Sequence, residues 1–168
     1  DGDGIQEIVI LDKDHSSTNG TGSYLGIVNW TNSSGFSSIS WVWTCAGGTK
    51  LMIGDSNNDA KEDVFVQDST NGSVCLHLAN TTGLSAFNNI SLTPEESLID
   101  TYVDDLDSDS RADLVFISTE GNLGVALSGS NSYSTFVNVS VPSNGSGGGG
   151  GGGLGGGGGE SSILSDLV

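Results

Sequence analysis

The sequence predicts an all-β protein built from repeats of about 50 residues. The main observation is an Asp-rich loop over residues 55–63 that recurs over residues 105–113, with a partial copy over residues 1–7. Each loop is followed at once by three apolar residues. Between the loops, short runs rich in β-branched and aromatic residues alternate with turns of Gly, Asn and Ser, and no stretch shows a sustained helical period.

These runs are expected to form short strands. They cover residues 7–11, 24–30 and 39–44 in the first repeat, 51–53, 64–67, 74–78 and 87–92 in the second, and 114–118, 123–127 and 136–141 in the third. Four short strands in about 50 residues is the period of a β-propeller blade. The predicted fold is therefore all-β, with about three blades of four antiparallel strands, incomplete at both ends and followed by a glycine-rich tail.

The repeats also divide the chain into units. The expected units are blades at residues 1–50, 51–97 and 98–142, a Gly-rich linker at 143–160, and the first strand of a further repeat at 161–168. The glycine tract within this linker favours a flexible linker, although an ordered tract with hydrogen-bonded neighbours is the alternative.

Both ends of the chain resemble parts of a repeat. The first loop lacks the position that Asp55 and Asp105 supply in the later loops, because that position would precede Asp1. Residues 163–168 resemble residues 98–103, which lie just before the third loop. We therefore expect a piece of a longer repetitive chain, or a unit whose ends join across copies.

The loops carry the residue types that bind calcium. Oxygen side chains at loop positions 1, 3, 5 and 9, with a backbone carbonyl at position 7, can supply the roughly six to eight oxygens that this hard cation takes. The predicted ligands are Asp1, Asp3, the Ile5 carbonyl and Glu7 in the first loop, Asp55, Asn57, Asp59, the Lys61 carbonyl and Asp63 in the second, and Asp105, Asp107, Asp109, the Arg111 carbonyl and Asp113 in the third. An array of Asx turns without metal is the alternative. An EF-hand is disfavoured, because strand-like residues follow each loop.

A family resemblance follows from the loop and its surroundings. The pattern hydrophobic-Gly-Asp-x-Asn-x-Asp-x-x-x-Asp-hydrophobic, followed by Val-x-Leu-x-Leu and Gly-x-x-x-Phe, is most complete over residues 53–87. It resembles the FG-GAP/VCBS repeat, and the resemblance covers nearly all of residues 1–141. It implies integrin-α-like calcium-binding propeller blades, similar also to those of some fungal lectins. The Gly usual at the sixth loop position, where it relieves a left-handed turn, is present as Gly4, but Ala60 and Ser110 replace it later, which predicts that these two loops are either slightly strained or differently shaped.

Composition points to the outside of the cell. With 21 acidic and 4 basic residues, the net charge of −17 disfavours nucleic acid or an anionic membrane as a partner. No stretch approaches the ~20 apolar residues of a membrane span. Eight Asn-x-Ser/Thr sequons predict a secreted or cell-surface glycoprotein. They lie at Asn19, Asn29, Asn32, Asn71, Asn80, Asn89, Asn138 and Asn144.

The two cysteines are also consistent with an extracellular location. An even number of cysteines in an extracellular chain usually indicates a bridge, and Cys45 with Cys75 is the only intrachain pair. Two buried free thiols are the alternative.

No catalytic constellation is recognisable. His15 and His77 have no neighbouring metal-ligand or triad partners in sequence, and no nucleophile elbow, Walker loop or zinc signature is present. Both histidines are expected to be surface or satisfied strand residues. Trp41 and Trp43 share one face of a strand and could stack on sugar rings, with packing between blades as the alternative.

These observations predict a non-enzymatic, calcium-binding, N-glycosylated extracellular module that serves as a structural or adhesive scaffold, including as a fibre or filament subunit. The expected partners are other copies or repeats of the same protein, covalent N-glycans, and extracellular glycans or proteins. The alternative function is a glycan-binding lectin or an integrin-like recognition propeller.

Overall fold

The structure, a computed structural model, describes residues 7–17, 20–31, 35–92, 97–129, 132–134 and 139–140. Within these ranges the regular elements are all β-strands, which confirms the predicted all-β class. The same ranges therefore hold no helix that is long and apolar enough to cross a membrane. The expected tail units at 143–160 and 161–168 lie outside the described residues.

The strands form three main antiparallel sheets and two short hairpins. The first sheet contains β1 (Ile8–Ser17), β2 (Gly20–Val28) and β5 (Ser40–Trp43); the second contains β6 (Gly48–Gly54), β7 (Asp63–Asp68), β8 (Ser73–His77) and β11 (Asn88–Ser91); the third contains β12 (Leu98–Asp104), β13 (Asp113–Ser118), β14 (Asn122–Ala126) and β15 (Val139–Ser140). The hairpins pair β3 (Trp30–Thr31) with β4 (Gly35–Phe36) and β9 (Ala79–Asn80) with β10 (Gly83–Leu84).

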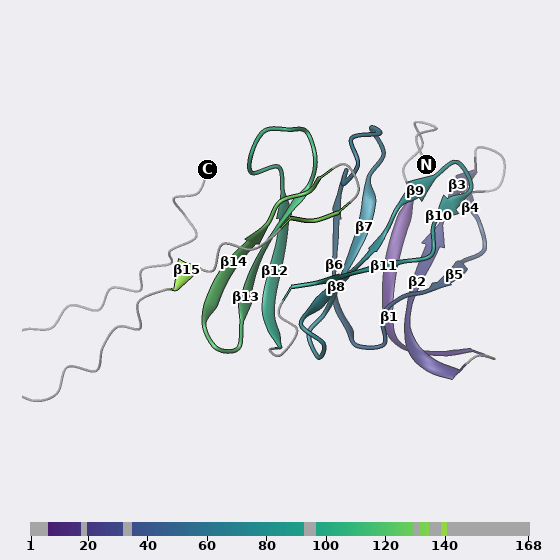
Figure 1. The fold of residues 1–168 in the computed structure, drawn as a ribbon. Coiled ribbons are helices and arrows are strands. Elements are labelled where there is room, and N and C mark those ends of the chain that lie inside the picture. The colour runs from purple at the N-terminus through teal and green to yellow at the C-terminus, as the bar shows by residue number, and fades with distance from the viewer. Residues whose placement is uncertain are drawn as a thin grey trace, which may run out of the picture.

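The three sheets lie side by side in chain order, with the second between the other two (Figure 1). The strand order is β1-β2-β5 in the first sheet, β6-β7-β8-β11 in the second and β12-β13-β14-β15 in the third. Each sheet is thus a meander of neighbouring antiparallel strands, and none of the described sheets is closed.

The second and third sheets repeat one another residue by residue. Gly54 pairs with Asp63 in the second sheet. The residues 50 positions later, Asp104 and Asp113, pair in the same way in the third sheet. Each first strand also carries a β-bulge near its start. In both sheets the Asp-rich loop joins the first strand to the second, so the sequence repeat is also a structural repeat.

Some strand boundaries differ from the expected ones. β6 begins at Gly48, so the expected unit boundary between residues 50 and 51 falls inside a strand. The hairpin of β1 and β2 continues to the pair Ser17 and Gly20, well beyond the expected end at residue 11. The polar residues after Leu11 concealed this extension, because pairing satisfies the backbone whatever the side chains are. Of the strand expected over 136–141, the structure describes β15.

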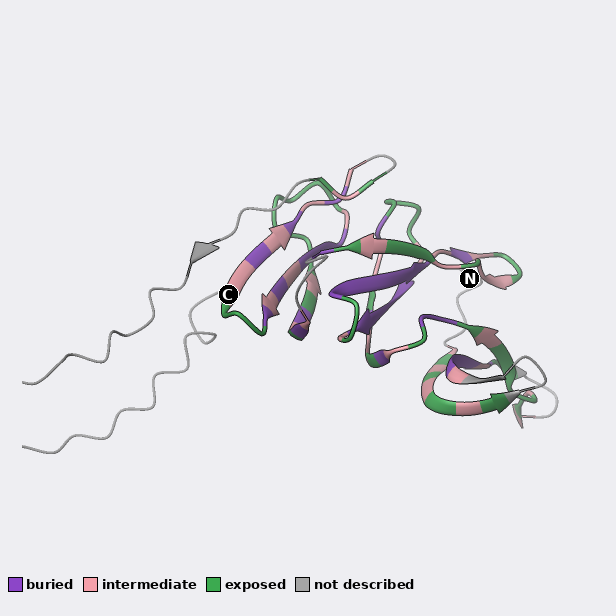
Figure 2. Cartoon of the chain, turned by 60° about the horizontal axis from the view of Figure 1, so that its bottom comes forward, coloured by how far each residue is buried: buried purple, intermediate pink, exposed green. Residues whose placement is uncertain are grey.

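The core lies on both faces of the second sheet. All six residues of β7 and all five of β8 are buried (Figure 2). Because side chains alternate along a strand, β7 serves two clusters. Val64 and Val66 pack with Leu25 of the first sheet, whereas Phe65 packs with residues of the third. The cluster between the second and third sheets contains Met52, Phe65, Val74, Leu76, Leu92, Leu98, Ala112, Leu114, Phe116 and Ala126.

A buried histidine joins the first two sheets. His77 in β8 is fully buried, with Nδ1 2.9 Å from the Ser85 carbonyl oxygen and Nε2 2.9 Å from Thr44 Oγ1. A carbonyl can only accept, so Nδ1 carries the proton and Nε2 accepts from the Thr44 hydroxyl. Burial lowers the pKa of His77, since loss of water penalises the charged ring. This arrangement fits the expectation of a satisfied strand histidine.

The free energy of unfolding should therefore decrease as the pH falls below about 6.5. The unfolded chain binds a proton on this histidine near that pH, whereas the folded chain resists protonation until a lower pH. The folded state then holds fewer protons, and stability is lost as the pH falls from the unfolded pKa towards the lowered folded pKa. Urea unfolding midpoints between pH 7.5 and 5 would measure the loss.

A His77→Gln variant should be less stable at neutral pH and should lose less stability between these pH values than the wild type. His15→Gln is the matched control, because it removes the other histidine of the chain. Equal pH slopes for His77→Gln and the wild type would contradict the assignment.

Candidate metal centre

The two complete Asp-rich loops, residues 55–63 and 105–113, lie at the same end of their sheets (Figure 1). They are also joined directly, because the Ala112 amide donates a hydrogen bond of 2.7 Å to the Asp55 carbonyl. Gly54 permits this approach, since a Cβ atom built there would lie 2.8 Å from the Ala112 Cβ. The loops therefore form one continuous region of the molecule.

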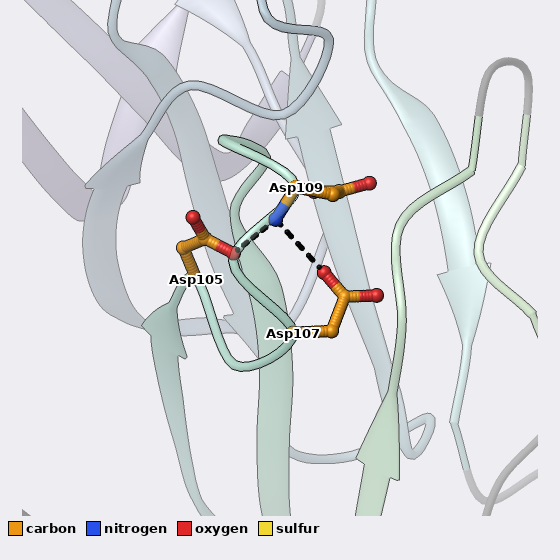
Figure 3. Close-up of side chains that lie close together, drawn as sticks. All are labelled: Asp105, Asp107 and Asp109. Carbon is orange, nitrogen blue, oxygen red and sulfur yellow. Dashed lines mark hydrogen bonds between the residues drawn. The ribbon is translucent and has the colours of Figure 1, made fainter.

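In the third loop, three carboxylates converge. One oxygen from each of Asp105, Asp107 and Asp109 lies within 4.8 Å of the others, and all three side chains are exposed (Figure 3). The Asp109 amide donates to Asp105 Oδ1 (3.1 Å) and to Asp107 Oδ1 (3.2 Å), which holds the side chains around it. Like charges about 4 Å apart repel by roughly 1 kcal/mol per pair in water. A cation between them would remove this repulsion.

The second loop repeats this hydrogen bonding with a lower charge. The Asp59 amide donates to Asp55 Oδ1 (3.2 Å) and to Asn57 Oδ1 (3.0 Å). Asn57 stands where the third loop has Asp107, and Lys61 Nζ lies 3.2 Å from Asp59 Oδ2. Slight loss of hydration acts to raise the pKa of Asp59, but the hydrogen bonds and charge of Lys61 outweigh it and hold this pKa below its usual value. The second loop is therefore the weaker candidate for a divalent cation.

The ninth-position aspartate of the third loop lies outside the cluster. Asp113 is fully buried at the start of β13, and it is not part of the three-carboxylate group. Its Oδ2 accepts from the Leu106 amide (2.9 Å) and its Oδ1 from the Ser128 amide (2.7 Å). This carboxylate therefore ties the start of the loop to the segment after β14.

Asp63 has the same role in the second loop. It is fully buried, accepts at Oδ2 from the amide and hydroxyl of Ser56, and accepts at Oδ1 from the Ala79 amide at 2.7 Å. Spacing alone could not separate this role from metal ligation, because both roles need a carboxylate at the ninth position.

The remaining predicted ligands are placed as follows. Glu7 is half-buried and directly precedes β1, whereas Asp1, Asp3 and Ile5 lie outside the described residues. The Lys61 and Arg111 carbonyls belong to the two complete loops and stay predicted ligands.

Sequence reasoning missed one support of the third loop. The Tyr133 hydroxyl donates a hydrogen bond of 2.8 Å to the Ala112 carbonyl, and its ring meets Phe65 edge to face with centroids 6.4 Å apart. Burial, with the nearby Asp113 charge, raises the pKa of Tyr133, so the hydroxyl remains a donor. Nothing in the local sequence marks this tyrosine, because its partner is 21 positions away.

The backbone of both loops is left-handed at the fourth and sixth positions. The φ angles are 59° at Asn58 and 63° at Ala60 in the second loop, and 63° at Ser108 and 67° at Ser110 in the third. This confirms the left-handed turn expected at the sixth position. For a residue with a Cβ, that conformation costs about 1–2 kcal/mol.

The Ala60→Gly and Ser110→Gly variants should each be more stable than the wild type by up to about 1 kcal/mol. Glycine removes the steric cost of the positive φ, and this gain exceeds the added entropy of the unfolded chain. Chemical denaturation would measure the change.

The control is Glu62→Gly, at an exposed loop residue without a positive φ, and it should be destabilising. A loss of stability in all three variants would show that the loop backbone is not strained.

Half of the sequons lie within the described residues. Asn29, Asn71 and Asn89 are exposed and Asn80 is half-buried, whereas Asn19, Asn32, Asn138 and Asn144 lie outside the described residues. The side-chain amide of Asn71 donates to Asp68 Oδ2 at 2.7 Å, so a glycan there would have to replace or retain this bond.

The two cysteines lie together as buried thiols at the junction of the first and second sheets. Cys45 follows β5 and Cys75 lies in β8, and both belong to one core cluster. The hydrogen bond to Cys45, with burial, raises the pKa of Cys75. The structure therefore brings the expected pair together, and the bridge itself stays a prediction.

Trp41 and Trp43 lie in an exposed aromatic row on the first sheet. Their side chains are 38 % and 42 % exposed. The ring centroid of His15 is 4.1 Å from that of Trp41, and the ring centroid of Tyr24 is 5.1 Å from that of Trp43. His15 Nδ1 also lies 3.1 Å from Asp12 Oδ2, so an acidic side chain borders this row.

Searches of protein-family models, curated proteins and solved structures find no match to this chain. The FG-GAP/VCBS resemblance therefore rests on the loop motif and its spacing.

Proposed function

We propose that this chain is a non-enzymatic, calcium-binding extracellular scaffold module, built from propeller-type blades of the FG-GAP/VCBS kind. The observation that supports it most directly is the convergence of Asp105, Asp107 and Asp109 in a loop whose hydrogen bonding recurs 50 residues earlier. The two loops are linked through the Ala112 amide, so cations bound there would stiffen the junction of two neighbouring sheets.

The donor set favours a hard cation such as calcium over zinc or copper. Every candidate side-chain ligand is a carboxylate or an amide oxygen, and hard cations take such ligands, whereas zinc and copper favour Cys and His. The cluster is exposed, so water can complete the coordination. Asp105, Asp107 and Asp109 would hold the ion in the third loop, and Asp55, Asn57 and Asp59 would hold it in the second. The bound cation would supply charge neutralisation.

An extracellular location is supported by the sequons and the cysteines. Three of the four described sequon asparagines are exposed, which gives a glycan room. Oxidation of Cys45 and Cys75 would join the first and second sheets covalently, with both electrons passing to a low-molecular-weight disulfide through thiol–disulfide exchange. Such a bridge is typical of oxidising compartments.

About 1 mM calcium should stabilise the fold by roughly 0.4–1.4 kcal/mol per occupied site, taking the affinity typical of extracellular modules. The Asp107→Asn variant gives the third loop the same ligand types as the second loop. Calcium should therefore raise its unfolding temperature less than it raises that of the wild type. Without calcium, it should be as stable as the wild type or more stable, because one repulsive charge is removed. Thermal unfolding with calcium and with excess chelator measures both effects.

Glu120→Gln is the matched control, since it removes one exposed charge outside the loops. This variant should show the same rise in unfolding temperature on addition of calcium as the wild type. An unfolding temperature that is the same in calcium and in chelator would refute the metal assignment.

The scaffold function is tested on the native material by electron microscopy, in millimolar calcium and after chelation. Regular filaments that fray without calcium are the expected result. Intact mass, measured before and after reduction and deglycosylation, should show the Cys45–Cys75 bridge and covalent glycans. Discrete globular particles without glycan or bridge would contradict the proposal.

Glycan recognition is the second candidate function, because the exposed Trp41 and Trp43 rings could stack on sugars. Specific binding on a glycan array that is lost in Trp41→Ala or Trp43→Ala would favour it over the scaffold.

A further inference from the structure

The outer face of the first sheet carries several exposed apolar side chains, beside the polar pair of Asp12 and His15. Ile10 pairs with Gly26, which pairs with Trp41, and directly paired residues share a face of the sheet. Ile8, Ile10, Trp41 and Trp43 lie on this face, which we call the head face, and are 46 %, 41 %, 38 % and 42 % exposed. Side chains of the other face, such as Leu25, pack on the second sheet.

The repeat shows that this exposure is unusual for the position. Counting from the Asp-rich loops, Ile10 is equivalent to Val66 in the second sheet and to Phe116 in the third. Val66 and Phe116 are 0 % and 1 % exposed, because each packs against the sheet that precedes it. Ile10 has the same position and no preceding sheet among the described residues.

The outer face of the third sheet, at the other end of the row, also carries apolar side chains. Leu114 and Phe116 pack towards the second sheet, so Val115 points the other way, and it pairs with Val125. Ile117 pairs with Leu123 on the same side. These four apolar side chains are half-buried, and we call their surface the tail face.

The positional equivalence between the repeats also indicates what kind of surface the tail face packs against. Val115 corresponds to Phe65 in the second sheet and to Val9 in the first. Phe65 packs against the third sheet, and Val9 packs against the cluster with the second. In both observed junctions, the face of one sheet that is equivalent to the tail face packs on the face of the next sheet that is equivalent to the head face. Among the described residues, the head and tail faces lie at opposite ends of the row of sheets, so these residues of one copy do not pair the two faces with each other (Figures 1 and 2).

We propose that the tail face of one copy packs on the head face of a second copy, which continues the sheet stack from chain to chain. The inference deepens the scaffold function proposed above and rests on it. Such a contact uses two different surfaces, and therefore extends into an open filament unless the rotation between copies closes a ring. The charge of −17 per chain opposes the contact, so association should need screening salt or calcium.

Sedimentation of the full glycosylated chain at increasing concentration, in 1 mM calcium and about 0.15 M salt, tests the contact. The mass should rise beyond one chain as the concentration increases. Trp43→Ala on the head face and Val125→Lys on the tail face should each weaken association at least about tenfold, as expected for an interface anchor. Ile10→Ser and Leu123→Lys provide second variants if either protein fails to fold, as judged by circular dichroism.

Mixing the two variants is the decisive step. Trp43→Ala retains its tail face and Val125→Lys retains its head face, so the mixture should form a one-to-one heterodimer and nothing larger. Phe36→Ala is the control, because Phe36 is 60 % exposed but lies on the hairpin of β3 and β4, and it should assemble like the wild type.

Three results would overturn the inference: a wild-type monomer at every concentration, wild-type assembly by both variants, or a mixture that stays monomeric. Assembly of the wild type that the variants leave unchanged would refute these faces and leave the scaffold function standing. A calcium-insensitive wild-type monomer, without filaments in the native material, would refute both. Release of assembled chains by a specific glycan would assign the tryptophans to sugar binding instead.

Discussion

Two buried carboxylates, Asp63 and Asp113, are the constraint on which the loops and the candidate metal centre depend. Burying a charge without compensation is costly. Each of these side chains offsets that cost by accepting from a backbone amide at the start of its own loop and from another beyond the third strand of its sheet. The loop is thereby held at both ends. Its remaining acidic side chains are left at the surface, where they converge around one backbone amide.

The same architecture connects the loops to the core. Gly54 allows the second loop to approach Ala112, and Tyr133 holds the Ala112 carbonyl from the other side while its ring packs on Phe65. A charge bound at the surface would therefore act on residues that belong to the contact between two sheets. This connection is the physical reason that a cation could stiffen a stack of sheets that has no covalent link at this junction in the described structure.

A stack of similar sheets has a general consequence for its two ends. The second sheet, the one described between two others, buries both faces, with Val66 of β7 on one side and Phe65 on the other. Of the described sheets, the first and third each pack one face on the second sheet, although their sequences keep the apolar pattern of the repeat on both faces. The exposed tryptophans of the first sheet and the half-buried valines of the third follow from this pattern.

The sequence by itself determined the all-β class, the repeat, most strands of the three main sheets and the identity of the loop residues, because strand alternation and turn chemistry are local properties. It also indicated the left-handed sixth position of each loop, since Gly4 stands there in the first copy. Only the tertiary structure decided that Asp113 faces inward while Asp105, Asp107 and Asp109 face one another. The hydrogen bonds and burial that separate these roles come from segments far apart in the chain, which spacing within one loop does not encode.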